Sequence, residues 1–233
     1  MQQGIVKGDV LQRLAGLSFI AGAILLIVFN AIFPRASDPA DVGQLVQKIA
    51  DTRGGFWEVD HLLLAVGIWA FMIGATGVYR SISTGGAAVW ARLGFYGVIV
   101  GTTLFTVLFA LEGFGLPQVV ELWEKAAGAD KAALFQVASS LAWMNAGLFS
   151  MTIIVYWLAL LFLGVGMALS TVYPKWLGWG IIVLAAAIII VVGLPQAFAG
   201  PSQLVTNTLF PILSILATVW GLALGVWTIR KAW

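Results

Sequence analysis

Six stretches of mostly apolar residues, each about 18 residues or longer, divide this chain, and nearly all of its charged residues lie between them. A helix of about 20 apolar residues crosses the hydrocarbon core of a bilayer, which is roughly 30 Å thick. We therefore predict an all-α membrane protein whose six transmembrane helices form three hairpins within a single domain, residues 1–233. The predicted spans cover residues 12–33, 57–79, 90–112, 139–169, 175–198 and 205–229.

The composition leaves little room for anything besides this bundle. Of the 233 residues, 61% are hydrophobic and 9% are charged, so almost no sequence remains for a soluble domain. The chain has no Cys, which excludes disulfides, thiol catalysis and iron–sulfur clusters. The first apolar run, Leu14 to Phe33, is longer than the core of a typical signal peptide, and we expect it to be retained as the first span.

Basic residues at the ends of the spans predict the orientation, because cytoplasmic loops of membrane proteins carry an excess of Lys and Arg. We expect both termini to lie in the cytoplasm and the chain to reside in the bacterial cytoplasmic (inner) membrane. Since the basic residues flank apolar spans, they do not indicate binding to nucleic acid. The segments expected on the cytoplasmic side hold one acidic residue, Asp9, and the basic residues Lys7, Arg13, Arg80, Arg92, Lys175, Arg230 and Lys231.

The spans show a weak internal similarity. The odd-numbered spans begin with Arg13-Leu14-Ala15-Gly16, Arg92-Leu93-Gly94 and Trp176-Leu177-Gly178. This spacing of about 80 residues is typical of an internal repeat, here of three parallel hairpins. Apolar sequence of low complexity produces similar matches by chance, so both interpretations stay open.

The connections expected on the outer side contain two short amphipathic segments. Residues 37–39 (Ser-Asp-Pro) are typical of a helix start, and apolar residues follow at positions 42, 45, 46 and 49, which is helical spacing. The second segment begins at Pro117 and includes Trp123. We predict two short interfacial helices that cap the bundle, with docking of a partner as the alternative role.

Most residues capable of chemistry gather at the predicted outer ends of the spans. His61, the only His of the chain, follows Asp60 near the start of the second span. Ionisable residues inside a membrane are costly and are functional candidates, whereas at the membrane boundary they form an ordinary interfacial cluster. The candidate outer polar site comprises Glu58, Asp60, His61, Glu112, Asn145, Gln196 and Asn207.

Three Trp residues lie in mid-span. Trp residues near the ends of spans, such as Trp57 and Trp123 on the outer side, are typical of the aromatic belt at a membrane interface. Trp69, Trp157 and Trp220 would instead either pack the core of the bundle or line a hydrophobic cavity for a lipid, a quinone or a pigment.

The residue types assign no cofactor, no metal and no catalytic residue. Bis-histidine haem ligation needs two His residues, and the chain has one. Asp60 and His61 are adjacent, so on a helix their side chains diverge by about 100°, which disfavours a joint metal site. Lys175 is the first residue of the fifth predicted span and no other Lys lies within a span, so no Lys lies at depth to form a retinal Schiff base.

Three short features are shared with a known group of proteins. They are the start of the fifth span (Tyr173-Pro174-Lys175-Trp176-Leu177-Gly178-Trp179), the Arg-Leu-Gly span starts, and the Trp and His at the start of the second span. Through these features the chain resembles small bacterial six-span integral membrane proteins over most of its length. The resemblance implies the six-span fold and brings no activity with it.

These observations favour a non-catalytic integral membrane protein, an accessory or scaffold subunit of an inner-membrane assembly that also binds a lipid or another hydrophobic ligand. Its expected partners are membrane lipids and other membrane subunits. A small transporter or permease with an outward-facing polar site is the first alternative, and a membrane enzyme acting on a lipid or isoprenoid is the second.

Overall fold

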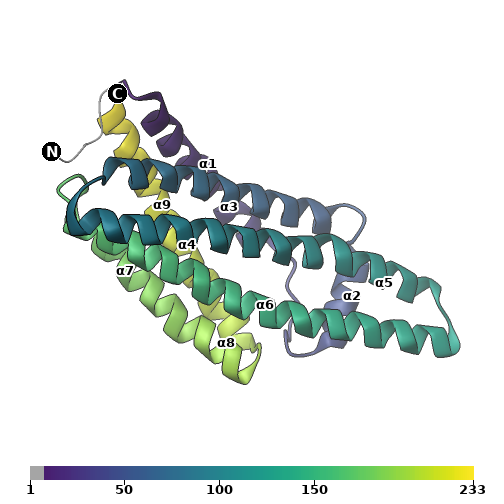
Figure 1. Cartoon of the computed structure of the whole chain (residues 1–233). Coiled ribbons are helices and arrows are strands. Elements are labelled where there is room, and N and C mark those ends of the chain that lie inside the picture. Colours follow the sequence, from purple (N-terminus) through teal and green to yellow (C-terminus); the bar gives the residue numbers. More distant parts are fainter. Residues whose placement is uncertain (1–7) are drawn as a thin grey trace.

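The computed structural model describes residues 8–233, and the secondary structure of this part of the chain is helical (Figure 1). Six of its helical segments are long and apolar enough to cross a membrane, which confirms the predicted all-α, six-span class. In the labels, η marks a π-helical turn. The spans are α1 (Val10–Ile32), α3 (Phe56–Ser81), α4 (Gly85–Ala110) with η1 (Leu111–Gly115) and α5 (Leu116–Lys125), α6 (Gly128–Leu169), α7 (Lys175–Ile188) with η2 (Ile189–Gly193) and α8 (Leu194–Ala199), and η3 (Gln203–Leu209) with α9 (Phe210–Ala232).

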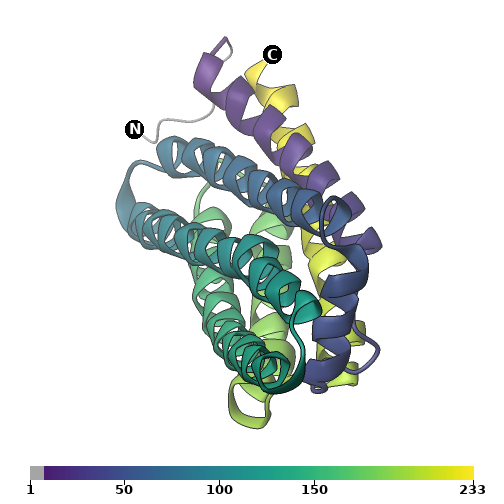
Figure 2. The same ribbon diagram turned by 90° about the vertical axis from the view of Figure 1, so that its right-hand side faces the viewer.

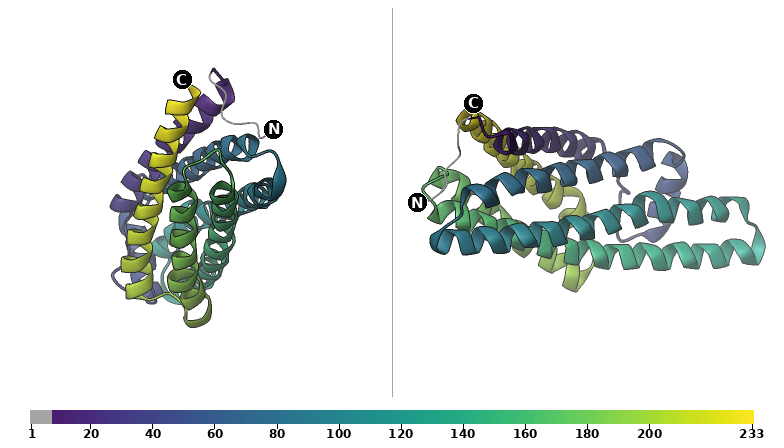
Figure 3. Two further views of the ribbon diagram at one scale, coloured as in Figure 1. Left: turned by 90° about the vertical axis from the view of Figure 1, so that its left-hand side faces the viewer. Right: turned by 45° about the horizontal axis from the view of Figure 1, so that its top comes forward.

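The six spans follow one another around a ring. α1 packs against α3 and α9, α6 packs against α4 and α7, and the contacts of α3 with α4 and of α7 with α9 close the ring. Figure 2 views the ring from the end that carries α2 (Val42–Thr52), and the left panel of Figure 3 views it from the opposite end. We call the first of these the α2 end. At the other end the Gly8 amide donates a hydrogen bond to the Ala232 carbonyl, so both ends of the described chain lie together.

Small residues allow the helices of the ring to approach closely. A Cβ atom added to Gly94 of α4 would lie 2.4 Å from the backbone nitrogen of Leu163 in α6. The glycines of the three similar span starts do not occupy equivalent places. Gly178 contacts α6, the span before it in the chain, and Gly16 contacts α9, the last span, which closes the ring, whereas Gly94 contacts α6, the span that follows it. The order of the spans around the ring is compatible with three parallel hairpin repeats. The contacts of the three glycines, however, are not equivalent from one hairpin to the next.

The third and fourth spans run far beyond the rest of the bundle at the α2 end (Figures 1 and 3). α6 has 42 residues, about 63 Å at 1.5 Å per residue, so it is much longer than a bilayer core is thick, and it begins at Gly128 instead of near residue 139. The third span continues to Lys125 instead of ending near residue 112. Pro117 does not stop it, because the π turn η1 comes first and the Leu116 amide bonds to the Leu111 carbonyl. The predicted second interfacial helix is therefore the continuation of this span.

α2 is a short helix, as predicted, but it begins later and packs differently. Asp41, rather than the residues at 37–39, caps it by accepting hydrogen bonds from the amides of Gly43 and Gln44. Its apolar stripe contains Val46 and Ile49, which are fully buried in a second hydrophobic cluster with residues of α3, α5 and α6. The apolar face of α2 thus covers protein instead of lying on lipid.

Candidate functional site

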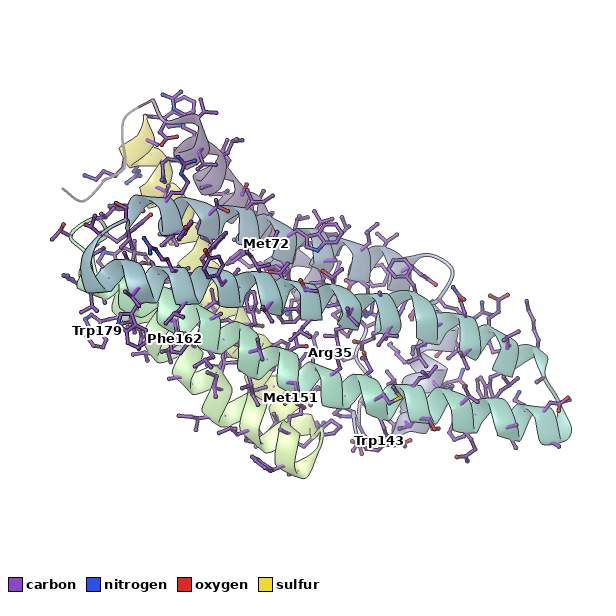
Figure 4. The ribbon with its side chains drawn as sticks, in the orientation of Figure 1. Arg35, Met72, Trp143, Met151, Phe162 and Trp179 are labelled. Carbon is purple, nitrogen blue, oxygen red and sulfur yellow. The ribbon has the colours of Figure 1, made fainter. Side chains whose placement is uncertain are left out.

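The ring encloses a cavity of about 230 Å³ that reaches the α2 end. This volume is well above the roughly 10–15 Å³ needed for one water molecule. Most of the wall is apolar and aromatic, and α1, α2, α3, α4, α6 and α9 all contribute to it. Trp143 of α6 lines the cavity and is 49% exposed, which places it at the opening (Figure 4). The deeper wall includes Leu64, Phe71, Phe105, Tyr156, Trp157, Leu160, Ala217 and Trp220.

Arg35 lies at the polar end of this cavity, in the loop between α1 and α2 (Figure 4). Its guanidinium donates hydrogen bonds to the side-chain and backbone oxygens of Asn30, at 2.7 and 2.8 Å. Burial lowers the pKa of Arg35 from its ordinary value, and attraction to Asp60 acts in the opposite direction. The loop thus holds a partly buried positive charge against the end of the first span.

Glu112 enters the cavity wall from the π turn η1. Its carboxylate accepts a hydrogen bond from the side-chain amide of Asn145 in α6, at 3.0 Å. Its backbone carbonyl accepts one from the indole N–H of Trp57 in α3, at 2.9 Å. These contacts fix the turn from two sides, and π turns inside α-helices occur frequently at functional sites.

His61 lies behind Glu112 and is fully buried among aromatic rings of Phe33, Trp57 and Phe109. Its Nδ1 is 2.7 Å from the Trp57 carbonyl, and a carbonyl only accepts, so Nδ1 carries a hydrogen. In neutral His61 the other nitrogen, Nε2, is therefore an acceptor. Nε2 lies 3.9 Å from a carboxylate oxygen of Glu112, too far for a direct hydrogen bond. Two acceptors thus face each other across this gap.

Asp60 is also fully buried, and neither of its carboxylate oxygens has a hydrogen-bond partner within residues 8–233. It interacts electrostatically with Arg35 and with Glu112, but no ion-pair contact within 4 Å joins it to either. A buried carboxylate without hydrogen bonds is costly, and groups in such surroundings are functional candidates. We call Asp60, His61, Glu112 and Asn145 the acidic cluster, in which Glu112 is partly exposed and the other three side chains are buried.

The other predicted polar-site residues lie elsewhere. Gln196 and Asn207 also line the cavity, and Asn207 donates a hydrogen bond to the Ala36 carbonyl at 2.9 Å. Glu58 does not join the acidic cluster, which corrects the prediction. It accepts hydrogen bonds from the amides of Gly54 and Gly55, because the free N–H groups before a helix attract a carboxylate. In the described residues no three His, Asp or Glu side chains are placed to hold a metal ion.

Of the three Trp residues predicted to line a cavity, two do so and one does not. Trp157 and Trp220 line the deep part of the cavity, and the indole N–H of Trp157 has no partner in the described part of the chain. Trp69 does not line it: Trp69 is 38% exposed on the outside of the ring, where it donates a hydrogen bond to Thr106. Trp57, expected in the interfacial belt, is fully buried instead.

Sequence reasoning missed Arg35 and Asn30. A signal was available in the way the odd-numbered spans end. The string Gly-Leu-Pro-Gln occurs at 115–118 and again at 193–196, and Phe33-Pro34-Arg35 takes the corresponding place after the first span. The residue after the proline, Arg35 or Gln196, lines the cavity in two of the three cases.

Comparison with known proteins found no match to this chain among protein-family models, characterised proteins or solved structures.

Proposed function

We propose that this protein is a non-catalytic subunit of the bacterial inner membrane that binds one amphiphilic, lipid-like molecule inside its ring. The observation that carries this proposal is the cavity, with an aromatic wall along most of its length and polar side chains at one end. Cavities that hold small molecules commonly combine an apolar wall with a few polar groups that orient the ligand. An apolar tail would pack between Phe71, Phe105 and Trp157, with its head near Glu112.

The shape of the interior favours holding a ligand over passing it across the membrane. The lining residues extend from the α2 end to the level of Leu160 and Trp220. Beyond that level the ring is filled by fully buried side chains, among them Leu163, Met167 and Leu224. Transporters hold their sites between two alternately opened halves, and this filled half supports a binding role instead.

The proposed orientation places both termini in the cytoplasm, because Arg80, Arg92, Lys175, Arg230 and Lys231 lie on the side of the termini. The extension of α5 and α6 would then project from the opposite face, where it offers a surface to other subunits. The Cys-free chain allows a direct test. A membrane-impermeant thiol reagent should label an Asp130→Cys variant in intact spheroplasts and a Lys231→Cys variant only after lysis, and the reverse pattern would exclude this orientation.

Filling the cavity should remove the bound molecule. We expect Ala146→Phe, which adds a ring to the wall formed by α6, to lower the amount of co-purified amphiphile about tenfold or more, because overpacking a filled site costs about 1–3 kcal/mol. The measurement is native mass spectrometry with lipid extraction from protein prepared in a mild detergent.

Val183→Phe is the matched control, because Val183 is 64% exposed on the outside of α7. It should keep the bound molecule at the level of the unchanged protein. Equal loss in both variants, or no bound amphiphile in any preparation, would refute the proposed function. Native electrophoresis of the same preparations tests the role as a subunit, which a lone monomer in several mild detergents would contradict.

A further inference from the structure

We propose that the polar end of the cavity takes a ligand head that carries an ammonium group, held by Glu112 and Asn145. This inference rests on the proposed function and names the chemical class of the amphiphile. It follows from the unpaired atoms of the acidic cluster, from its charge and from the aromatic rings beside it.

The two residues that face the Glu112 carboxylate each have an unpaired atom that accepts hydrogen bonds. These atoms are Nε2 of neutral His61 and the side-chain oxygen of Asn145. The Asn145 amide must point its nitrogen at the Glu112 carboxylate, which only accepts, so its oxygen is left free. His61 and Asn145 are both more than nine-tenths buried, so water at the surface does not satisfy these atoms, and Asn145 lines the cavity. A ligand that fits this end supplies donors, and an ammonium group has three and no acceptor.

The charges lead to the same ligand. Glu112 is the one carboxylate among the residues that line the cavity, and within residues 8–233 no Lys or Arg forms an ion pair with it. Arg35 is the one Lys or Arg among the residues that line the cavity, and Asn30 already engages its guanidinium. A carboxylate in the wall of an apolar cavity without an ion-pair partner is costly, and a cationic head would neutralise it. An anionic head would bring a second negative charge beside it.

Aromatic rings complete the surroundings of such a head. Phe33 and Phe109 line the cavity together with Glu112, and both pack on the His61 ring. A cation is attracted to the face of an aromatic ring, and clusters of aromatic rings are a known means of binding ammonium ligands.

This inference can be tested in nanodiscs of phosphatidylglycerol with three long-chain probes that carry bromine at the end of the tail. The probes have equal chain length and differ in their head, which is an amine, an alcohol or a carboxylic acid. Bromine quenches Trp fluorescence, and Trp157 and Trp220 lie where the tail would end. Binding in the cavity is measured as the difference in Trp quenching between the unchanged protein and the Ala146→Phe variant. This difference removes the quenching caused by probe dissolved in the bilayer. We expect the amine to bind about tenfold or more tightly than the alcohol, as for a hydrogen bond to a charged group, and the acid to bind most weakly.

Glu112→Gln keeps the shape of the side chain and removes its charge. It should reduce amine binding to the level of the alcohol while the alcohol binds as before, which also shows that the cavity is intact. Glu124→Gln is the control, because Glu124 pairs with Arg53 on the exposed extension, away from the cavity, and amine binding should not change.

The outcomes separate the two proposals. If no probe shows quenching that depends on the cavity, the proposed function fails. If tails bind in the cavity but the amine has no advantage, or the acid binds best, the ammonium assignment alone is overturned. Competition by added phosphatidylethanolamine would identify a membrane lipid as the source of the ammonium head, and an amine preference without that competition would identify a free amphiphilic amine.

Discussion

Gly94→Ala should destabilise the protein strongly for a substitution that adds a single methyl group. The added Cβ would lie 2.4 Å from the Leu163 nitrogen and 2.9 Å from the Ala159 carbonyl oxygen. Both are backbone atoms, so no rotation of a side chain relieves the overlap and α4 must move away from α6. We expect a cost of about 1–3 kcal/mol, which lowers the midpoint of thermal unfolding by about 2–12 °C in one detergent.

Gly147→Ala is the matched control for this experiment. Gly147 lies in the middle of α6 like the residues that Gly94 touches, but a Cβ there would meet no atom within 4 Å. Because alanine favours the helix over glycine by up to about 1 kcal/mol, this variant should keep or raise the unfolding midpoint. A Gly94→Ala protein as stable as the Gly147→Ala protein would show that α4 and α6 do not pack this closely.

The sequence predicts the spans well because hydrophobic length alone decides them. Apolar segments as long as Leu14 to Phe33 or 139–169 are expected to cross a membrane, and the same criterion identifies all six spans. The ends of the third and fourth spans were harder to predict. A charged residue such as Glu112 usually marks the end of an apolar span, and Pro117 usually marks the end of a helix. Only the packing of α5 against α6 and α2 shows why this helix continues through a π turn.

The site was predictable in its residue types and not in its geometry. The outward clustering of Asp60, His61, Glu112 and Asn145 is visible in the predicted topology, since all four lie near the same ends of their spans. Which side chains face inward depends on helix rotation, and apolar spans carry little amphipathic signal to indicate it. For that reason Trp69 could not be distinguished from Trp157 and Trp220. Arg35 was missed because it belongs to a loop whose path depends on tertiary contacts.

Trp57→Ala should reduce both stability and ligand binding, and its effect on stability should exceed that of Gly94→Ala. Trp57 of α3 is fully buried against α2 and the extension of α5 and α6. Its indole N–H donates a hydrogen bond to the backbone carbonyl of Glu112, at 2.9 Å. Removing a buried Trp side chain costs about 3–5 kcal/mol, which lowers the thermal midpoint by about 6–20 °C. The turn that carries Glu112 loses one of its two supports, so binding of the long-chain amine should fall as well.

Trp57→Phe separates the hydrogen bond from the packing. It keeps an aromatic ring but leaves the Glu112 carbonyl without the indole donor, which should cost about 1–3 kcal/mol and weaken amine binding more than alcohol binding. Trp69→Phe is the matched control, since it also removes an indole hydrogen bond, to Thr106, on the exposed outside of the ring. The control should change the thermal midpoint by less than about 3 °C and leave amine binding intact, because exposed substitutions stay within about 0.5 kcal/mol. Equal effects of the two Phe variants would show that Trp57 does not position Glu112.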